Sequence, residues 1–270
     1  MLETTTTYYE DESMFHGFIP RIMGTRFDAL LIHPDQTQTG QLWSLISNEL
    51  ERLDHMLNRF NPRSEVAQLN NGLLSCQPVQ VSEELWTMIQ LCHSYYQQTF
   101  RLFDITLKDF SQINFHVHRF ISSNQENLSL DFGGFAKGYA LKKIKEILLA
   151  AHIQDAFIDF GNSSILGIGH HPYGDCWKVS FLNPYNQTPL KEFVLRDTTL
   201  STSGNTQQYT GHIIHPLTGI YDEQRKASTI MSDDPLEAEV LSTVWMIADE
   251  DQRQRLSDTF KHIQGTIYTL

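Results

Sequence analysis

The order of helical and strand-like segments is the feature that most limits how this chain can fold. Apolar residues recur every three or four positions in four segments: residues 41–60, 82–98, 135–151 and 235–247. Shorter segments with the composition of strands lie around them: residues 113–121, 127–132, 154–159, 165–169, 176–182, 192–195, 227–231 and 262–269. The two kinds of segment do not alternate one for one. The order therefore predicts an α+β fold, a single compact domain with a mostly antiparallel sheet and packed helices.

The chain shows no internal repeat and no low-complexity linker, so we expect one domain over residues 21–270. Residues 1–20 contain a threonine run and an acidic cluster, and we expect a poorly ordered or loosely packed extension there. This segment lacks the basic start, apolar stretch and cleavage site of a secretory signal. We expect a cytoplasmic location for the chain as written, and a periplasmic one if a signal segment has been removed.

The charge balance narrows the class of partner. Lys and Arg number 20 and Asp and Glu number 32, which gives a net charge of −12. Such a surface repels a polyphosphate backbone, so we expect no nucleic-acid partner, although a small phosphate ligand in a local pocket is compatible with it. No apolar run reaches the ~18 residues of a membrane helix, so we expect no transmembrane segment. Three cysteines without paired spacing exclude a zinc ribbon and fit a reducing compartment.

A glycine turn followed by a lysine stands at the start of the third helical segment. Gly133 and Gly134 end a strand-like segment, and Lys137 and Gly138 lie in the first turn of the helix. Free N–H groups at a helix start, with one cation beside them, favour a phosphate. The order is not that of a Walker A loop, and a Gly-Gly turn of purely structural origin is the alternative.

Residues 200–205 are rich in hydroxyl groups and read as a turn. Thr202, Ser203 and Gly204 are suited to wrapping an anion, but no G-x-S-x-G elbow surrounds Ser203. A helix cap or a serine–threonine turn without a ligand is the alternative. Further on, His212 and His215 flank an apolar pair. Either imidazole is a candidate base or metal ligand, and a buried structural histidine is the alternative.

The helix over residues 235–247 carries a carboxylate on an apolar surface. Asp234 and Pro235 are typical of a helix start, and the turns that follow are apolar almost all round. Glu239 and Thr243 are one turn apart on this buried helix. An oxygen pair at this spacing suits Mg²⁺, which takes its other ligands from phosphate and water. A structural salt bridge from Glu239 to a Lys or Arg is the alternative.

Taken together and in order, the motifs resemble the ApbE-type flavin transferase family, the FAD:protein FMN transferases. The resemblance covers residues 23–270. It rests on eight motifs in order: Met23-Gly24-Thr25, the stretch from Leu53 to Asn70 with Pro62, Ser64 and Glu65, Phe103-Asp104-Ile105-Thr106, Asp131 to Tyr139, Gly161-Asn162 with Gly167, Thr202-Ser203-Gly204, His212 to Gly219, and Ala238 to Thr243.

The resemblance implies binding of FAD with Mg²⁺ and transfer of FMN, through a phosphoester bond, to a Ser or Thr hydroxyl of an acceptor protein. It implies an acceptor motif of the type D-G-[SA]-[TS], typically on a subunit of a membrane redox pump.

The resemblance also assigns roles to individual residues. It places Met23 at the flavin ring, Lys137 at the phosphates and His212 as the proton-transfer residue. Four further residues join Lys137 and Met23 in holding the ligand: Asp104, Gly133, Gly134 and Gly138. Three line the pyrophosphate: Thr202, Ser203 and Gly204. Three hold the metal: the Ala136 carbonyl, Glu239 and Thr243.

Three positions depart from the family pattern. Glu239 stands in place of an Asp, His215 in place of the Asp of an Asp-Pro pair, and Phe160 in place of the first Gly of G-G-N. These changes keep two alternatives open beside the transferase. One is hydrolysis of FAD to FMN and AMP without an acceptor, and the other is a flavin-binding relative without catalysis.

Overall fold

The computed structural model describes residues 2–106, 108–206 and 213–270. Its largest element is an eight-stranded sheet in the order β1-β2-β3-β7-β8-β11-β14-β15, with antiparallel neighbours throughout. The strands are β1 (Thr5–Tyr9), β2 (Met14–Ile22), β3 (Thr25–Ile32), β7 (Asp155–Phe160), β8 (Ser164–Ile168), β11 (Thr198–Gly204), β14 (Lys226–Ser232) and β15 (Gln264–Thr269). The expected α+β fold with a mostly antiparallel sheet is confirmed.

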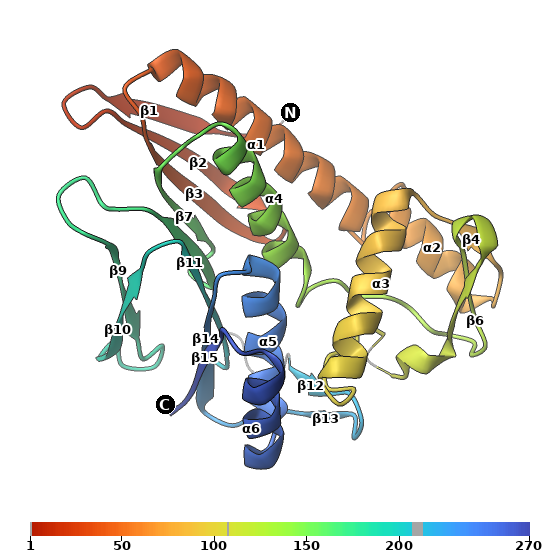
Figure 1. The fold of residues 1–270 in the computed structure, drawn as a ribbon. Helices are drawn as coiled ribbons and strands as arrows, with labels where there is room; N and C mark the ends of the chain where they lie inside the picture. The colour runs from red at the N-terminus through yellow and green to blue at the C-terminus, as the bar shows by residue number, and fades with distance from the viewer. Residues whose placement is uncertain (1, 107, 207–212) are drawn as a thin grey trace.

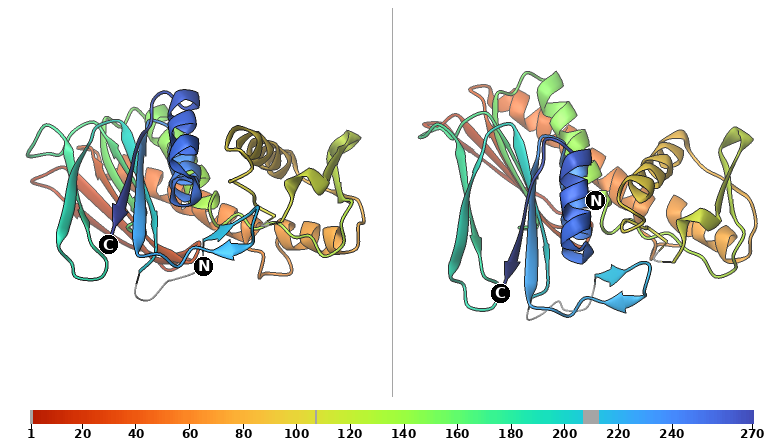
Figure 2. Two further views of the ribbon diagram at one scale, coloured as in Figure 1. Left: turned by 90° about the horizontal axis from the view of Figure 1, so that it is seen from below. Right: turned by 60° about the horizontal axis from the view of Figure 1, so that its bottom comes forward.

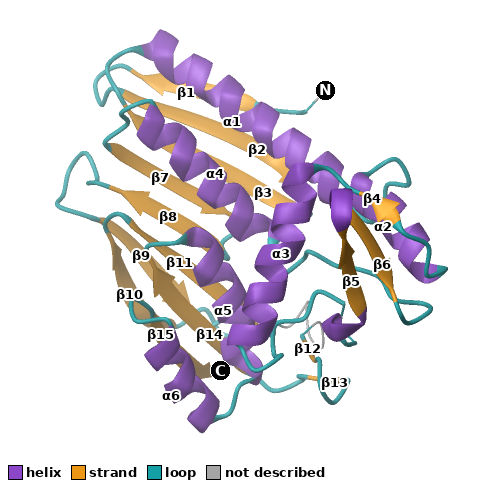
Figure 3. Cartoon of the chain, turned by 45° about the vertical axis from the view of Figure 1, so that its right-hand side comes forward, coloured by secondary structure: helices purple, strands orange, loops and turns teal. Residues whose placement is uncertain are grey.

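Three helices cover one face of this sheet: α1 (Gln36–Leu57), α4 (Ala136–Ala150) and α5 (Pro235–Ile247) (Figures 1 and 3). The strands alternate in burial, and their inward side chains form the core under the helices. Trp43 of α1 is central to this packing, with its ring 6.0 Å from Phe15 and 6.3 Å from Phe27.

Helix α5 has the bounds that its sequence predicts. The Asp234 carboxylate accepts hydrogen bonds from the N–H groups of Leu236 and Glu237, and Pro235 occupies the first turn. Most of its residues are buried between α4 and strands β11 and β14. A helix that is apolar almost all round is thus enclosed on several sides, as expected.

The opposite face of the sheet is covered in part by a hairpin of β9 (Trp177–Leu182) and β10 (Pro189–Leu195) (Figure 2). A second apolar cluster lies beneath it: Ile165, Trp177, Phe193, Leu195 and Leu200. Because side chains alternate along β11, Leu200 faces this hairpin and the neighbouring Ser201 faces α5.

A smaller lobe lies beside the main sheet, to the right in Figure 1. It contains α2 (Glu65–Leu74), α3 (Glu83–Gln98) and a three-stranded sheet of β4 (Val79–Gln80), β6 (Phe120–Ser123) and β5 (Ile113–His116). The remaining elements are short 3₁₀ turns η1 (Phe110–Gln112) and η2 (Val117–Arg119), the pair β12 (Ile214–His215) and β13 (Ile220–Tyr221), and α6 (Glu250–Thr259). In the described part of the chain, no helix is both long and apolar enough to cross a bilayer.

Two expectations about strands are wrong. Residues 5–20 are not a loose extension, because β1 and β2 form the first hairpin of the main sheet, with Thr5 opposite Phe18. The alternation of buried Phe15 and Ile19 with half-buried neighbours packs this hairpin under α1. Residues 127–132 form no strand, and β6 pairs with β5 instead. Their backbone is held by a side chain, since Asn70 donates to Leu130 O at 3.0 Å and accepts from Leu130 N at 2.8 Å.

A third expectation, a turn at residues 200–205, is also wrong. Residues 198–204 are strand β11, paired with both β8 and β14 inside the sheet. Buried hydroxyl groups cost free energy unless they find hydrogen-bond partners. Helix α5 supplies such partners for Ser201 and Ser203, through Glu239 and Ser242. Thr199 Oγ1 of the same strand is buried without a partner in the described part of the chain.

Candidate functional site

Several predicted residues lie in turns at one end of the main sheet. Met23 and Gly24 form the two-residue β2–β3 turn, with φ of 47° and 80°, as a type I′ turn requires. A β-carbon on Gly161, in the β7–β8 turn, would lie 2.3 Å from Thr25 Oγ1, so the two turns are in contact. The N–H of Thr202 donates to Ser163 O at 2.7 Å. The end of β11 therefore lies at the same edge.

Phe160 stands where the family motif has a glycine, so a large side chain is expected in this turn. The structure shows that the Phe160 side chain does not lie there. Its side chain is fully buried, and its ring packs edge-on against Phe27 with centroids 5.2 Å apart. The turn itself is made by Gly161 and Asn162, with φ of 68° and 57°. The departure at Phe160 is thus absorbed by the core beneath the turn.

Glu239 is the centre of a buried polar network between α5, α4 and the sheet. It is 4% exposed, and its Oε1 pairs with the Lys137 ammonium. Its Oε2 accepts hydrogen bonds from Ser164 of β8 and, at 3.0 Å, from Ser201 of β11. The structure thus contains the salt bridge that the sequence left open, with Lys137 as its cation. A buried carboxylate needs such a partner to offset its desolvation.

The hydroxyl groups extend this network toward the end of β11. Ser242 Oγ lies 3.1 Å from Ser201 Oγ and 2.8 Å from Ser203 Oγ. Ser203 Oγ lies 3.3 Å from Thr243 Oγ1. Because a carboxylate only accepts, Ser201 donates toward Glu239 and its lone pairs remain for a neighbour. A continuous chain of polar contacts therefore joins Glu239 to the half-buried Thr243.

The start of α4 brings Lys137 to this network. Ala136 is the first residue of α4, and its N–H donates to Phe132 O at 2.8 Å. A β-carbon on Gly134 would lie 3.6 Å from Thr243 Oγ1, so the glycine turn passes directly beside that hydroxyl. At Gly138 a β-carbon would lie 2.5 Å from Glu239 Cβ and 2.8 Å from Pro235 O. Gly138 therefore permits close packing of α4 on α5.

Two predicted ligand-holding groups make contacts within their own loops. Gly133 donates its N–H to the Asp131 carboxylate at 2.9 Å. The buried Asp104 carboxylate accepts from the Thr106 N–H at 2.7 Å, the Thr106 hydroxyl at 2.6 Å and the Phe110 N–H at 3.0 Å. Burial raises the pKa of Asp104 and these hydrogen bonds oppose the rise. Asp104 thus fixes the shape of the loop that follows α3.

Gly204 has a packing reason for being glycine. A β-carbon there would lie 2.7 Å from the β-carbon of Ala227 on the neighbouring strand β14. Of the two histidines, His212 lies outside the described residues. His215 is in β12, and its Nδ1 is buried without a hydrogen-bond partner in the described part of the chain.

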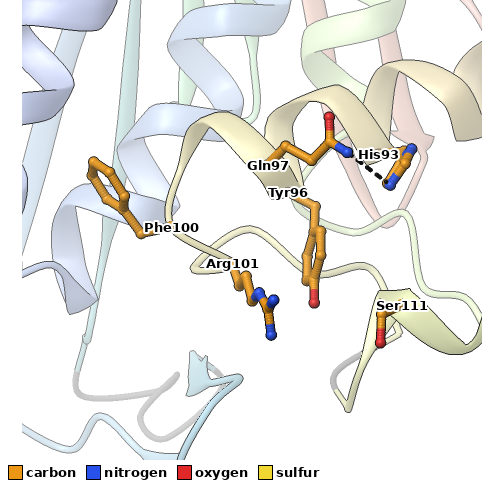
Figure 4. A pocket seen from close by; sticks show the side chains of 6 residues that line it. All are labelled: His93, Tyr96, Gln97, Phe100, Arg101 and Ser111. Atoms are coloured by element: carbon orange, nitrogen blue, oxygen red, sulfur yellow. Dashed lines mark hydrogen bonds between the residues drawn. The ribbon is translucent and has the colours of Figure 1, made fainter.

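A hollow of about 440 Å³ lies apart from this network, between the end of α3 and η1. It is lined by His93, Tyr96, Gln97, Phe100, Arg101 and Ser111, and Figure 4 shows the Arg101 and Tyr96 side chains pointing to the same side. The Arg101 guanidinium lies 5.9 Å from the centre of the Tyr96 ring. Burial, with a hydrogen bond to Asp109, raises the pKa of Tyr96 to about 12. The described contacts do not connect this hollow to Glu239.

Two oxygen donors lie one turn apart on α5, the Glu239 carboxylate and the Thr243 hydroxyl, and Thr243 is beside Gly134 of the turn before α4. Oxygen donors of these kinds are the ligands that hard divalent cations take. The described residues contain no cluster of three or more His, Cys, Asp or Glu side chains that could hold a metal. Mg²⁺ is compatible with so few protein carboxylates, because it retains water and takes phosphate oxygens.

Three members of the network were not predicted: Ser164, Ser201 and Ser242. Ser242 is part of the Ala238–Thr243 motif, and Ser164 is the second residue after Asn162 of the β7–β8 turn. Their places in these two motifs were the sequence signal that could have identified Ser164 and Ser242. The contacts themselves join residues 38 to 75 positions apart, so spacing along the chain does not reveal them.

Fold and site define an α+β protein with a buried carboxylate, a lysine at a helix start and a row of hydroxyls at one sheet edge. The chain belongs to the ApbE family, whose model matches residues 23–116 and 107–267. Two relatives are each described as an FAD:protein FMN transferase. That of Chlamydia muridarum is 24% identical over 68% of this chain and 67% of its own length. That of Klebsiella pneumoniae is 21% identical over 86% of this chain and 82% of its own length.

Solved structures share the fold. Flavin transferase ApbE from Vibrio cholerae superposes with a TM-score of 0.81 at 18% identity, over 99% of this chain and 94% of that one. The apo form of the flavinyl transferase ApbE of Pseudomonas stutzeri gives 0.78 at 18% identity, over 98% and 90%. At these identities the likeness concerns the fold.

Proposed function

We propose that this chain transfers FMN from FAD to a Ser or Thr hydroxyl of an acceptor protein, through a phosphoester bond and with Mg²⁺. The observation that carries the proposal is the placing of Lys137, Glu239 and Thr243 together beside the start of α4. A helix start with a lysine attracts phosphates, and the carboxylate supplies the site for a cation. The descriptions of the relatives support the choice of FAD as substrate.

In the proposed reaction, the acceptor hydroxyl oxygen forms a bond to the phosphorus of the FMN half. The bond from this phosphorus to the bridging oxygen breaks, and AMP leaves with the electron pair. The hydroxyl proton passes to a base, for which His212 is our candidate. Lys137 and the start of α4 hold the phosphates, and the β2–β3 turn at Met23 lies near the flavin ring.

Glu239, Thr243 and the Ala136 carbonyl would hold Mg²⁺, which neutralises phosphate charge when bound. The polar contacts of Glu239 with Ser164 and Ser201 fix the carboxylate on the face of α5 that looks toward α4. The Thr202–Gly204 segment lines the pyrophosphate. We further propose that the acceptor carries a D-G-[SA]-[TS] motif on a redox-pump subunit.

The test combines the purified protein with FAD, Mg²⁺ and an acceptor polypeptide that carries this motif. We expect covalent flavin fluorescence on the acceptor, release of AMP, and no labelling when the acceptor Ser or Thr is replaced by Ala. FAD cleavage without labelling of any acceptor would identify a hydrolase. Binding of FAD without cleavage would identify a non-catalytic relative.

A substitution at the candidate base tests the assignment of His212. We expect His212→Ala to lower the transfer rate by about 10²–10⁴-fold, the usual contribution of a general base, with little loss of FAD affinity. Single-turnover labelling and flavin fluorescence titration measure the two effects separately. Equal losses in rate and affinity would make His212 a ligand-holding residue.

A further inference from the structure

The two carboxylate oxygens of the buried Glu239 side chain have different partners. Oε2 of Glu239 accepts hydrogen bonds from the hydroxyls of Ser164 and Ser201, whereas Oε1 accepts one from the Lys137 ammonium. The side chains of Glu239 and Lys137 are only 5% and 20% exposed. The lysine therefore occupies the position beside Oε1 that a divalent cation on Glu239 would need.

We infer that Lys137 is a positioning residue that alternates between two anions. It holds Oε1 of Glu239 when no divalent cation is bound, and it passes to the ligand's phosphates when the carboxylate takes a cation. This inference rests on the proposed function. The phosphate role of Lys137 does not by itself imply this exchange, and neither does the metal role of Glu239.

Charge supports the exchange. Two cations in contact with the same carboxylate oxygen repel each other, so the ammonium and a divalent ion cannot share Oε1 favourably. A buried carboxylate without any cation is strongly unfavourable, so Glu239 needs one in either state. Lys137 satisfies this need in the free protein, and its flexible four-carbon stem lets the ammonium leave without moving α4.

The position of Lys137 at the start of α4 supports its movement to the phosphates. Lys137 is the second residue of α4, where the N–H groups of the helix start favour anions. Thr243, the other side chain proposed for the cation, lies beside Gly134, in the glycine turn that leads into α4. A phosphate bound at this helix start is thus adjacent to both the released ammonium and the cation site.

The same two helices provide a matched control. Lys142 of α4 pairs with Asp234 at the start of α5, at 2.6 Å. Both side chains are more than a third exposed, at 39% and 37%. Replacing Lys142 removes one positive charge from the same helix without removing the partner of Glu239.

The experiment uses Mn²⁺ as the probe and measures free Mn²⁺ by electron paramagnetic resonance, without FAD. We expect Lys137→Met to bind Mn²⁺ more tightly than the unsubstituted chain by at least about fivefold, the lower end of ordinary coupling between sites. Flavin fluorescence with Mg²⁺ present gives the second readout. There we expect Lys137→Met to bind FAD at least about fivefold more weakly, and Lys142→Met to be unchanged in both measurements.

Unchanged or weaker Mn²⁺ binding by Lys137→Met would overturn the exchange, and so would unchanged FAD affinity. Lys137→Gln keeps a donor for Glu239 and replaces Lys137→Met in both assays if that variant does not fold. If the unsubstituted chain binds no FAD, the proposed function fails, while the Mn²⁺ comparison still decides whether Lys137 and a divalent ion compete. Absence of Mn²⁺ binding in every variant overturns the exchange itself.

Discussion

Glu239 shows how one buried side chain can organise a site made by four elements. It joins α5 to α4 through Lys137, and to β8 and β11 through Ser164 and Ser201. Its extra methylene, relative to the Asp of the family motif, lengthens the arm that reaches these partners. The sequence left a metal ligand and a salt bridge as alternatives, and the pairing with Lys137 is compatible with both roles.

We expect Glu239→Ala to lower the free energy of unfolding by about 3–5 kcal/mol, because it leaves a partly buried ammonium and two buried hydroxyls without their acceptor. Chemical denaturation followed by circular dichroism measures the change. Glu146→Ala is the control, since the exposed Glu146 carboxylate pairs with Lys143 at 3.3 Å near the surface. Its expected cost is below about 1 kcal/mol. Equal costs for the two variants would show that the Glu239 network contributes little to stability.

Asp109 gives the chain a predicted acid sensitivity. Hydrogen bonds from Ser111, then Gln112 and Tyr96, lower the pKa of Asp109 from 3.8 to about 2, against the opposing effect of burial. A lowered folded-state pKa stabilises the protein above the unfolded-state value, and this stabilisation is lost as the pH falls through the folded-state value. The window for Asp109 therefore runs from about pH 4 down to about pH 2.

We expect Asp109→Asn to be less stable than the unsubstituted chain near neutral pH by about 1 kcal/mol, since solvent screens the half-buried carboxylate. The difference should shrink from pH 4 to pH 2. Urea unfolding at several pH values measures it, with the exposed Glu126→Gln as control. A difference that does not change with pH would contradict the assignment.

At the scale of elements, the loop that leads into α4 depends on a side-chain clamp. Asn70 of α2 is buried and makes two hydrogen bonds to the backbone of Leu130. The next residue, Asp131, donates its N–H to Ile105 O at 2.7 Å. These contacts replace the strand pairing that residues 127–132 lack, and they set the position of the glycine turn beside Thr243.

We expect Asn70→Ala to cost about 2–4 kcal/mol, because two buried backbone groups lose their partners. FAD affinity should fall as well, since the turn over residues 133–138 loses its anchor. Thermal unfolding and flavin titration measure the two effects. Asn71→Ala, at the exposed neighbouring position of α2, should change neither. A neutral Asn70→Ala would show that α2 does not hold this loop.

Elements with local signals could be predicted, and elements defined by distant partners could not. The bounds of α5 follow from Asp234 and Pro235, and α3 begins after Ser82, whose hydroxyl accepts from the Leu85 N–H. Strand β11 has small polar residues whose acceptor, Glu239, lies 38 positions further along the chain from Ser201. Nothing within β11 itself indicates that Ser201 and Ser203 find partners when buried.

At the scale of the molecule, the residues of the candidate site lie in short ordered motifs that the sequence singles out, but the contacts among them could not be predicted from it. The family resemblance assigns Lys137 to the phosphates and Glu239 to the metal. In the structure the two side chains contact each other, although they are 102 positions apart in the sequence. Gly138 and Gly204 were expected to hold a ligand, yet each has a neighbour within 3 Å of its would-be β-carbon. Close packing alone accounts for glycine at both positions.

The net charge of −12 leads to the last prediction. FAD carries two phosphates, so an acidic protein repels it unless a cation is bound at the same site. We therefore expect FAD and Mg²⁺ to raise the melting temperature cooperatively, with a shift for both together that exceeds the sum of the separate shifts. A ligand that binds only the folded state at 100 times its Kd adds about 2.7 kcal/mol to the free energy of unfolding.

Differential scanning fluorimetry with FAD alone, Mg²⁺ alone and both together measures these shifts. Glu239→Ala should retain a cooperative transition but lose the extra shift, because the carboxylate that would hold the cation is gone. Lys142→Met, which loses only an exposed pair between the same helices, should retain it. Strictly additive shifts in the unsubstituted chain would mean that FAD and the divalent ion bind independently, and the cation would then have no place beside the phosphates.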